Sequence, residues 1–219
     1  MKFGIIKERK NPPDRRVVFL PEKLVELKTQ FPTAEIKVES SNIRIFGDKR
    51  YSEKGLDVVE DVSNCDVLIG VKEVPIDALI PNKKYFFFSH TIKKQPYNRK
   101  LLKAIIDKNI ELYDHEVIVK ENGARLIGFG RYAGIVGAYN GFRAIGLTKK
   151  TFSLPKAETL ADFNDLVAEL QKVKIPNIKI CLTGSGKVAN GAKEILDDMN
   201  IKQVNVDEYL FEVFTEPTF

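Results

Sequence analysis

Short apolar runs alternate with helix-like segments along the first half of this chain, and this alternation restricts the fold more than any other feature. Pro21 and Pro96 each open a segment whose apolar residues recur at helical spacing. Between these segments lie runs that are too short for helices and rich in β-branched or aromatic residues, at positions 2–7, 35–39, 65–72, 85–88 and 110–114. The alternation predicts an α/β fold with a mostly parallel, doubly wound, Rossmann-like sheet.

Ionisable residues follow three of these expected strands, at the edge where open parallel sheets place their ligands. They are Lys72 and Glu73 after one strand, His90 after the next, and Glu116 after the third. A lysine that is partly removed from water or lies near another cation loses its proton more readily, and neighbouring carboxylates tune both the lysine and a histidine. We therefore interpret these four residues as catalytic candidates that relay protons. His115, which should point to the other face of its strand, is expected to be structural.

Two simpler interpretations of these residues stay open at this level. His90 can be a core histidine with satisfied hydrogen bonds, and the set as a whole can be a group of ion pairs at loop ends. Arg16 and Arg125 suit ligands that carry carboxylates, because guanidinium groups bind carboxylates in bidentate fashion, but either arginine alone can also be a surface charge.

The last third of the chain resembles the start of a second domain, of the kind that binds a dinucleotide. A helix at 131–147 carries small residues along one side, which permits close helix contact, and we expect it to bridge two domains. Residues 178–183 and 204–206 are predicted strands. Between them, Gly184-x-Gly186-x-x-Ala189 matches a dinucleotide fingerprint, and Asp207 follows the second strand at about the expected distance. The alternative is a tight turn without a ligand. We expect the boundary between domains 1–148 and 149–219.

The charge pattern and the cysteines exclude several classes of protein. The net charge is +5, but the 35 basic residues are scattered among 30 acidic ones, so no nucleic-acid partner is expected. No apolar run approaches the length of about 18 residues that spans a bilayer, and the first residues lead directly into a strand, so we expect no membrane partner and a cytoplasmic protein. Cys65 and Cys181 lack metal-ligand spacing, which indicates two reduced, buried thiols and no metal.

Six motifs in order resemble the alanine dehydrogenase and saccharopine dehydrogenase superfamily, and within it most closely the lysine 2-oxoglutarate reductase domain. The motifs are KERKNPPDRRVVFLP (7–21), GVKEVP (70–75), FFSHTIKKQ (87–95), LYDHEV (112–117), AGIVGAYNG (133–141) and TGSGKVANGA (183–192). The resemblance covers nearly the whole chain. It implies a substrate domain for an amino acid and a 2-oxo acid, a Rossmann domain for NAD or NADP, and reaction between them. A homodimer is a further expectation.

The resemblance also implies roles for individual residues. Lys72 and His90 are similar to the acid–base pair, and Glu73 and Glu116 to the carboxylates that tune it. The two arginines, at positions 16 and 125, are similar to anchors for substrate carboxylates. The implied reaction joins lysine and 2-oxoglutarate to form saccharopine, reversibly and with a nicotinamide cofactor.

Two departures from the family pattern shape the expectation. Ala189 replaces the third glycine of the fingerprint, and the chain stops at Phe219, soon after the second predicted strand of the nucleotide domain. We therefore expect a piece of a longer enzyme, inactive by itself, whose first domain still folds. The alternatives are an alanine dehydrogenase-like enzyme and a non-catalytic module that binds amino acids.

Overall fold

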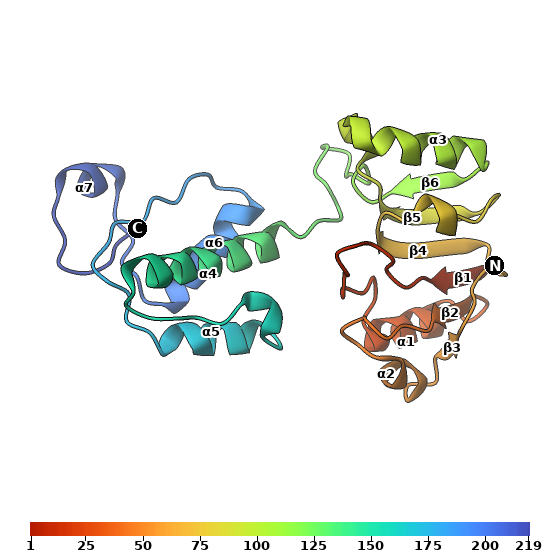
Figure 1. Cartoon of the computed structure of the whole chain (residues 1–219), viewed down its shortest axis with the longest axis horizontal. Helices are drawn as coiled ribbons and strands as arrows, with labels where there is room; N and C mark the ends of the chain where they lie inside the picture. The colour runs from red at the N-terminus through yellow and green to blue at the C-terminus, as the bar shows by residue number, and fades with distance from the viewer. The chain divides into compact units, whose positions relative to one another are not determined.

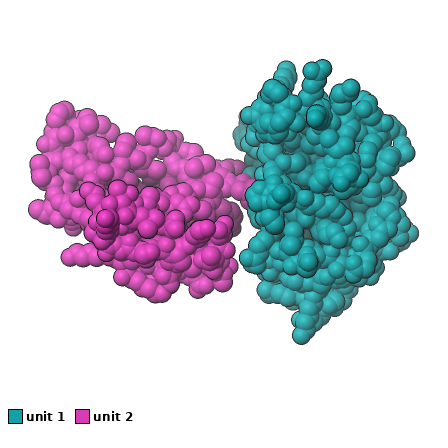
Figure 2. Space-filling view, viewed as in Figure 1, with its two compact units in different colours: residues 1–128 teal, residues 129–219 magenta.

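The computed structural model describes all residues, 1–219, and they form two compact units, Met1–Gly128 and Phe129–Phe219 (Figure 2). The division lies earlier than the expected boundary after residue 148. The reason is that the long helix α4 (Gly130–Lys149) packs along α6 (Lys187–Asp198), so it belongs to the second unit. No helix of the chain combines the length and the apolar character that crossing a bilayer requires.

The first unit is a six-stranded, all-parallel sheet, which confirms the predicted α/β fold (Figure 1). Its order is β3-β2-β1-β4-β5-β6. The strands are β1 (Lys2–Ile5), β2 (Glu35–Glu39), β3 (Asp57–Val59), β4 (Val67–Lys72), β5 (Lys84–Phe88) and β6 (Glu111–Asp114). The chain proceeds outward from β1 to β3 and then returns to β4 beside β1, so the order reverses between β1 and β4. This is the position at which doubly wound sheets form a ligand crevice.

Helices cover both faces of this sheet because side chains alternate along each strand. On one face, Ile5 packs with Leu24 of α1 (Pro21–Gln30), near the short helix α2 (Asp48–Ser52). On the other face, Leu68 and Phe87 pack with Leu101 of α3 (Arg99–Asp107). Short 3-10 turns complete the connections at η1 (Ile76–Ala78), η2 (Thr91–Lys93) and η3 (Pro96–Asn98).

One strand was absent from the prediction. β3 lies between the predicted strands at 35–39 and 65–72, where the sequence analysis predicts no strand. Only three residues, Asp57–Val59, pair with β2 at the edge of the sheet. A run this short carries no periodicity that distinguishes it from a loop. Its place in the sheet is decided by pairing with Lys37–Glu39 rather than by its own sequence.

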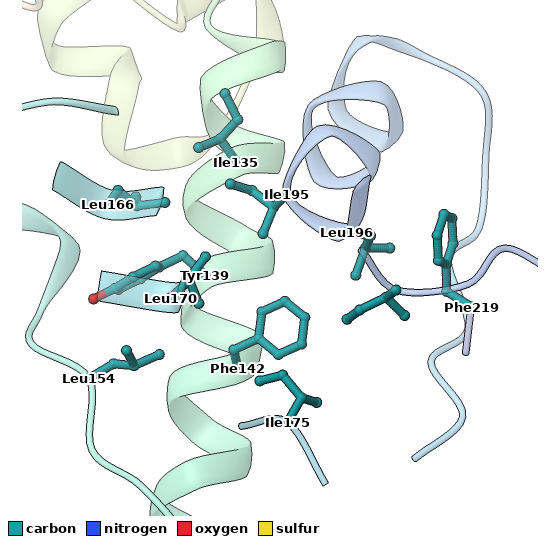
Figure 3. Close-up of a cluster of buried hydrophobic side chains, with 11 residues drawn as sticks. Ile135, Tyr139, Phe142, Leu154, Leu166, Leu170, Ile175, Ile195, Leu196 and Phe219 are labelled. Carbon is teal, nitrogen blue, oxygen red and sulfur yellow. The ribbon is translucent and has the colours of Figure 1, made fainter. Parts of the chain in front are cut away.

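The second unit is built from helices around one apolar core. Besides α4 and α6 it contains η4 (Ala157–Thr159), α5 (Phe163–Gln171) and α7 (Val206–Phe211). Figure 3 shows Tyr139 of α4, Leu166 and Leu170 of α5, and Ile195 of α6 in this core. The exposed fraction of Tyr139, Leu170 and Ile195 is 0%.

Two glycines allow α4 and α6 to approach each other at backbone contact. A Cβ atom on Gly134 would lie 1.9 Å from the carbonyl oxygen of Val188, and one on Gly191 would lie 2.0 Å from that of Arg131. A Cβ atom on Gly137 would meet nothing within 4 Å. The expectation that small residues serve close helix contact therefore holds for Gly134.

Both strands predicted in this unit are wrong. Residues 178–183 and 204–206 form no strands, and α7 begins at Val206, so Asp207 lies in the first turn of a helix. The nearby backbone instead forms isolated bridges to Thr218, which pairs with Lys179 and with Lys202. A strand in a parallel sheet requires a continuous neighbour, and apolar composition alone does not supply one.

The cysteines divide between buried and exposed positions. Cys65 is a buried free thiol, as expected, and burial raises its pKa. Cys181 is an exposed free thiol, so the expectation of a second buried cysteine is wrong. It lies in the segment that was predicted to be a buried strand and is not one.

Candidate active site

Four strands of the first unit deliver polar residues to the carboxyl edge of the sheet. The chain leaves β1 through a loop that contains Glu8 and Arg16, β4 ends at Lys72, β5 leads to His90, and β6 leads to Glu116. Because all of these strands are parallel, their carboxyl ends lie at one edge. The predicted catalytic residues are therefore brought together.

His90 has an unusual backbone conformation that turns the chain sharply at the end of β5. Its φ and ψ are 58° and 8°, in the left-handed region that non-glycine residues rarely adopt. The buried side chain of Asn98 donates a hydrogen bond to the His90 carbonyl oxygen at 3.1 Å. On the other side, the buried Ser89 hydroxyl donates to Asp114. These contacts hold His90 in a conformation that costs energy.

Lys72, His90 and Glu116 form a connected chain of polar atoms. The Nδ1 atom of His90 lies 3.0 Å from Glu116 Oε2, and its Nε2 atom lies 3.4 Å from the Nζ atom of Lys72. A carboxylate only accepts hydrogen bonds, so the contact with Glu116 favours the tautomer with the proton on Nδ1 and the lone pair of Nε2 toward Lys72. The ammonium group of Lys93 lies 3.2 Å from the same Nδ1 atom and favours the opposite tautomer. Asp114 orients the carboxylate by accepting a hydrogen bond from the Glu116 amide at 2.8 Å.

Charge and burial tune the ends of this chain. Burial, together with repulsion from Arg16 and Lys10, lowers the pKa of Lys72. Burial acts to raise the pKa of Glu116, but hydrogen bonds from His90 and Lys93 outweigh it and the pKa is lowered. A lysine with a lowered pKa beside a histidine whose other nitrogen is held by a carboxylate is an arrangement that can accept and return protons.

Glu73 also lies at this edge, with one oxygen bound and the other buried without a partner. Lys10 donates to its Oε1 at 2.6 Å. Burial acts to raise the pKa of Glu73, but the Lys10 contact outweighs it and lowers the pKa. Oε2 is buried and makes no hydrogen bond. An unpaired buried carboxylate oxygen is an acceptor available to a bound ligand.

The two predicted substrate arginines both contact carboxylates of this chain. Arg16 forms a bidentate pair with Asp14, and this hydrogen bonding lowers the pKa of Asp14 and raises that of Arg16. Arg125 lies 3.6 Å from Glu116 Oε1, and about half of its side chain is exposed. Arg16 also lies near enough to Lys72 to influence its protonation.

Several residues of this edge were missed by sequence analysis, namely Glu8, Lys10, Asp14, Lys93 and Asn98. Lys10 and Asp14 lie in a loop with two prolines, and no local pattern distinguishes them from surface charges. Their proximity to a motif arginine was the only available signal.

The glycine turn of the second unit has the backbone that the fingerprint predicts, at residues 184–189. Gly184 has φ +89°, and Gly186 is the N-cap of α6 and would have nothing within 4 Å of an added Cβ atom. Ala189 is buried on α6 behind the turn. Asp207 does not follow a strand, as described above, so its expected relation to this turn is wrong.

A model of the family described as "Alanine dehydrogenase/PNT, N-terminal domain" matches residues 4–136, which include the whole carboxyl edge of the sheet. The chain belongs to this family. The expected superfamily is thus confirmed.

Curated relatives of this chain are considerably longer than it is. It is 31% identical over 192 residues to alpha-aminoadipic semialdehyde synthase, mitochondrial, of Bos taurus, which covers 80% of this chain and 21% of the relative. It is 29% identical over 214 residues to alpha-aminoadipic semialdehyde synthase of Arabidopsis thaliana, covering 88% of this chain and 20% of the relative. The chain therefore spans about a fifth of the length of these two relatives.

Shorter relatives and solved structures agree with this family. Saccharopine dehydrogenase [NAD(+), L-lysine-forming] of Yarrowia lipolytica is 27% identical over 194 residues, which cover 78% of this chain and 51% of the relative. A solved L-alanine dehydrogenase matches with a TM-score of 0.60 and 17% identity, covering 100% of this chain and 60% of that one. The transhydrogenase from Sinorhizobium meliloti also has a TM-score of 0.60, with 14% identity over 91% of this chain and 62% of that one. At these identities the two structures show the shared fold alone.

Proposed function

We propose that this chain supplies the substrate-binding and acid–base part of an oxidoreductase that, with NAD or NADP, interconverts lysine plus 2-oxoglutarate and saccharopine. The observation that carries the proposal is the connected arrangement of Lys72, His90 and Glu116 at the sheet edge, with Nζ 3.4 Å from Nε2 and Nδ1 3.0 Å from the carboxylate. A relay of this kind suits imine formation, which needs protons removed and returned at neighbouring atoms.

Each residue of the relay has one task in the proposed reaction. As the substrate amine adds to the oxo carbon, the ammonium nitrogen gives up two protons in turn to a base. An acid returns two protons in turn to the oxygen, which leaves as water, and a protonated imine remains. His90 Nε2 and Lys72 Nζ are the two atoms positioned to exchange those protons. Glu116 stabilises the imidazolium when His90 is protonated, and the unpaired Oε2 atom of Glu73 accepts from the substrate ammonium.

Arg16 and Arg125 bind the substrate carboxylates in this proposal. Both side chains lie at the sheet edge, and each contacts a carboxylate of the chain, Arg16 with Asp14 and Arg125 with Glu116, which supports this role. A dicarboxylate such as 2-oxoglutarate matches two guanidinium groups better than pyruvate does, since pyruvate has one carboxylate.

The glycine turn of the second unit fits the pyrophosphate of a dinucleotide. Gly184 and Gly186 leave the backbone open at the N-terminus of α6, and Ala189 permits the close packing behind it. When bound, the nicotinamide supplies the hydride that reduces the imine carbon. Asp207 has no role in this proposal, because its position in α7 removes the reason for assigning one.

Relatives support the lysine substrate over two alternatives. Three of the relatives above carry names that refer to saccharopine or to aminoadipic semialdehyde, and the match to L-alanine dehydrogenase is a likeness of fold. An alanine dehydrogenase-like enzyme would accept pyruvate and ammonia. A binding module would take up the amino acid with no need for a relay.

The proposal is tested by measuring the dehydrogenase activity of the protein encoded by the longest reading frame that contains these residues. We expect NAD(P)H oxidation with lysine plus 2-oxoglutarate and much less with pyruvate plus ammonia. His90→Gln and Lys72→Met should each lower kcat by at least tenfold, and the double variant should lose less than the sum of the two, as for groups that act as a unit. Arg16→Ala should raise the KM for 2-oxoglutarate, and Arg50→Ala on α2 is the matched control. Wild-type kcat in the double variant would overturn the acid–base assignment.

The 219-residue chain by itself provides a second, simpler test. We expect it to show no measurable turnover and to bind 2-oxoglutarate through its first unit, with weaker binding in Arg16→Ala, as measured by calorimetry without nicotinamide. Equal binding of 2-oxoglutarate by Arg16→Ala and the wild type would contradict the proposed role of Arg16.

A further inference from the structure

The strand that carries Lys72 is irregular just before the lysine. Pairing of β4 with β5 runs from Val67 to Ile69 in register and then shifts, so that Lys72 pairs with Phe88 across a bulge. On the other side of β4, the ladder to β1 ends at Ile69. Bulges re-aim the side chains that follow them, and they leave backbone groups without ladder partners. Three backbone polar groups of residues 70–72 find side-chain partners: the amides of Val71 and Lys72 and the carbonyl oxygen of Gly70.

Glu8 satisfies two of these groups with one carboxylate. Its Oε1 accepts from the Val71 amide at 2.7 Å, and its Oε2 accepts from the Lys72 amide at 2.8 Å. Glu8 is only 9% exposed. Burial raises the pKa of its carboxyl group, although the two backbone hydrogen bonds oppose that shift. Burying a carboxylate costs free energy, and here the two hydrogen bonds to the bulge and the attraction of Arg16 offset that cost.

His115 satisfies the third group from the opposite direction. Its Nε2 lies 3.0 Å from the carbonyl oxygen of Gly70, which can only accept, so Nε2 carries the proton. The residue is 6% exposed, burial lowers its pKa, and its Nδ1 has no partner. His115 is thus a neutral donor. A Cβ atom on Gly70 would lie 2.9 Å from the Ile6 side chain and 3.4 Å from Glu8 Oε1, so a larger residue here would displace the Ile6 side chain.

We propose that Glu8 and His115 are positioning residues that hold the β4 bulge from its two sides and thereby set the placement of the Lys72 ammonium against His90. We call residues 8 and 115, with the backbone of 70–72, the bulge bracket. The bracket does not touch the proposed substrate. It fixes the backbone position of Lys72 at the end of β4, directly after the bulge.

Backbone exchange and the titration of Lys72 test the bracket without any assumption about activity. In the 219-residue chain, Glu8→Gln keeps the shape of the side chain but replaces one carboxylate oxygen with an NH₂ group. That group faces the backbone N–H of Val71 or Lys72 and cannot accept its hydrogen bond. We expect amide hydrogen exchange at Val71 and Lys72 to accelerate at least tenfold, with Leu68 on the same strand unchanged. The ¹³Cε signal of Lys72 should shift and titrate at a different pH, because its distances to Lys10, Asp14, Arg16, Glu73 and His90 change.

A matched control and a second pair of variants separate positioning from general stability. Glu39→Gln alters another buried carboxylate at the same edge, which accepts from the Lys7 amide, and it should leave the Lys72 signal unchanged. His115→Gln retains a donor toward Gly70 and should resemble the wild type, whereas His115→Leu should reproduce the effect of Glu8→Gln. If Glu8→Gln fails to fold, the His115 pair decides the question.

Two outcomes would overturn the bracket. One is an unchanged Lys72 titration and unchanged Val71 exchange in folded Glu8→Gln, and the other is equal behaviour of the two His115 variants. Turnover in the longer reading frame rests on the proposed function and is a separate readout, with kcat expected to fall at least tenfold in Glu8→Gln at nearly constant KM. A shifted Lys72 signal with unchanged kcat would support the bracket and reject Lys72 as a catalytic residue.

Discussion

The two units of this chain differ in how far local sequence agrees with the folded result. In the first unit, every predicted strand appears, and β2 appears with the predicted bounds of Glu35–Glu39. In the second unit, both predicted strands are wrong, while the predicted helix at 131–147 is present within α4. Similar apolar runs thus become strands in one unit and irregular chain in the other.

The difference teaches that a strand depends on its neighbours more than on its composition. In the first unit each inner strand lies between two others, whereas near residues 179 and 202 the backbone finds only the short segment Thr218–Phe219. The Thr218 amide donates to Ile178 and the Phe219 amide donates to Lys202. Helices form their backbone hydrogen bonds within one segment, so they do not need a neighbouring strand.

The largest expected effect in the first unit comes from emptying its core. Phe87→Ala removes a fully buried ring from between β5 and α3, and it should lower the free energy of unfolding of that unit by about 3–5 kcal/mol. Amide hydrogen exchange measured separately for 1–128 and 129–219 should show the loss in the first unit alone. Phe211→Ala, at a side chain that is 82% exposed, is the control with little effect. Equal loss in both units would mean that they unfold as one.

The corresponding change in the second unit is to separate its two close helices. Gly134→Ala places a methyl group 1.9 Å from the Val188 oxygen, so α4 and α6 must move apart, at a cost of about 1–3 kcal/mol. Gly137→Ala, on the same helix with open space, should be neutral or stabilising because alanine favours helix more than glycine does. Thermal unfolding, monitored by amide hydrogen exchange of residues 129–219, distinguishes the two variants. Similar stability of both variants would contradict the close contact.

Acid should weaken the first unit through the carboxylates of its site. The pKa of Glu116 is lowered in the folded state, so its stabilising contribution is present above the ordinary pKa of 4.5 and is lost as pH falls through the folded value. We expect Glu116→Gln to lower stability at pH 7 and to flatten the decline of stability below pH 4.5. The exposed Glu26→Gln is the control. A decline as steep as that of the wild type would show that other groups cause it.

The smallest expected effect is a gain in stability from replacing Lys72. The pKa of Lys72 is lowered by burial and by Arg16 and Lys10, so its protonated form opposes folding at neutral pH. Lys72→Met should slightly raise the melting temperature of the first unit at pH 7. In the wild type, this cost should fade as pH rises through the lowered pKa toward 10.5. A lower melting temperature in the variant would mean that the packing of Lys72 outweighs its charge.

Sequence alone determined the parallel α/β fold and the gathering of Lys72, His90 and Glu116 at one edge. Periodicity is a local property, and parallel strands necessarily end on the same side, so neither conclusion needed coordinates. The glycine turn at Gly184 followed in the same way, since a left-handed residue before a helix favours glycine.

Only the tertiary structure decided which groups meet within that edge. The contacts of Glu8 and His115 with the β4 bulge and the pairing of Lys10 with Glu73 each join residues more than 40 positions apart. Desolvation and pairing are non-local, so spacing along the chain contains no record of them. The same reason explains why two apolar segments near the end of the chain are not strands: their partners, not their residues, decide that outcome.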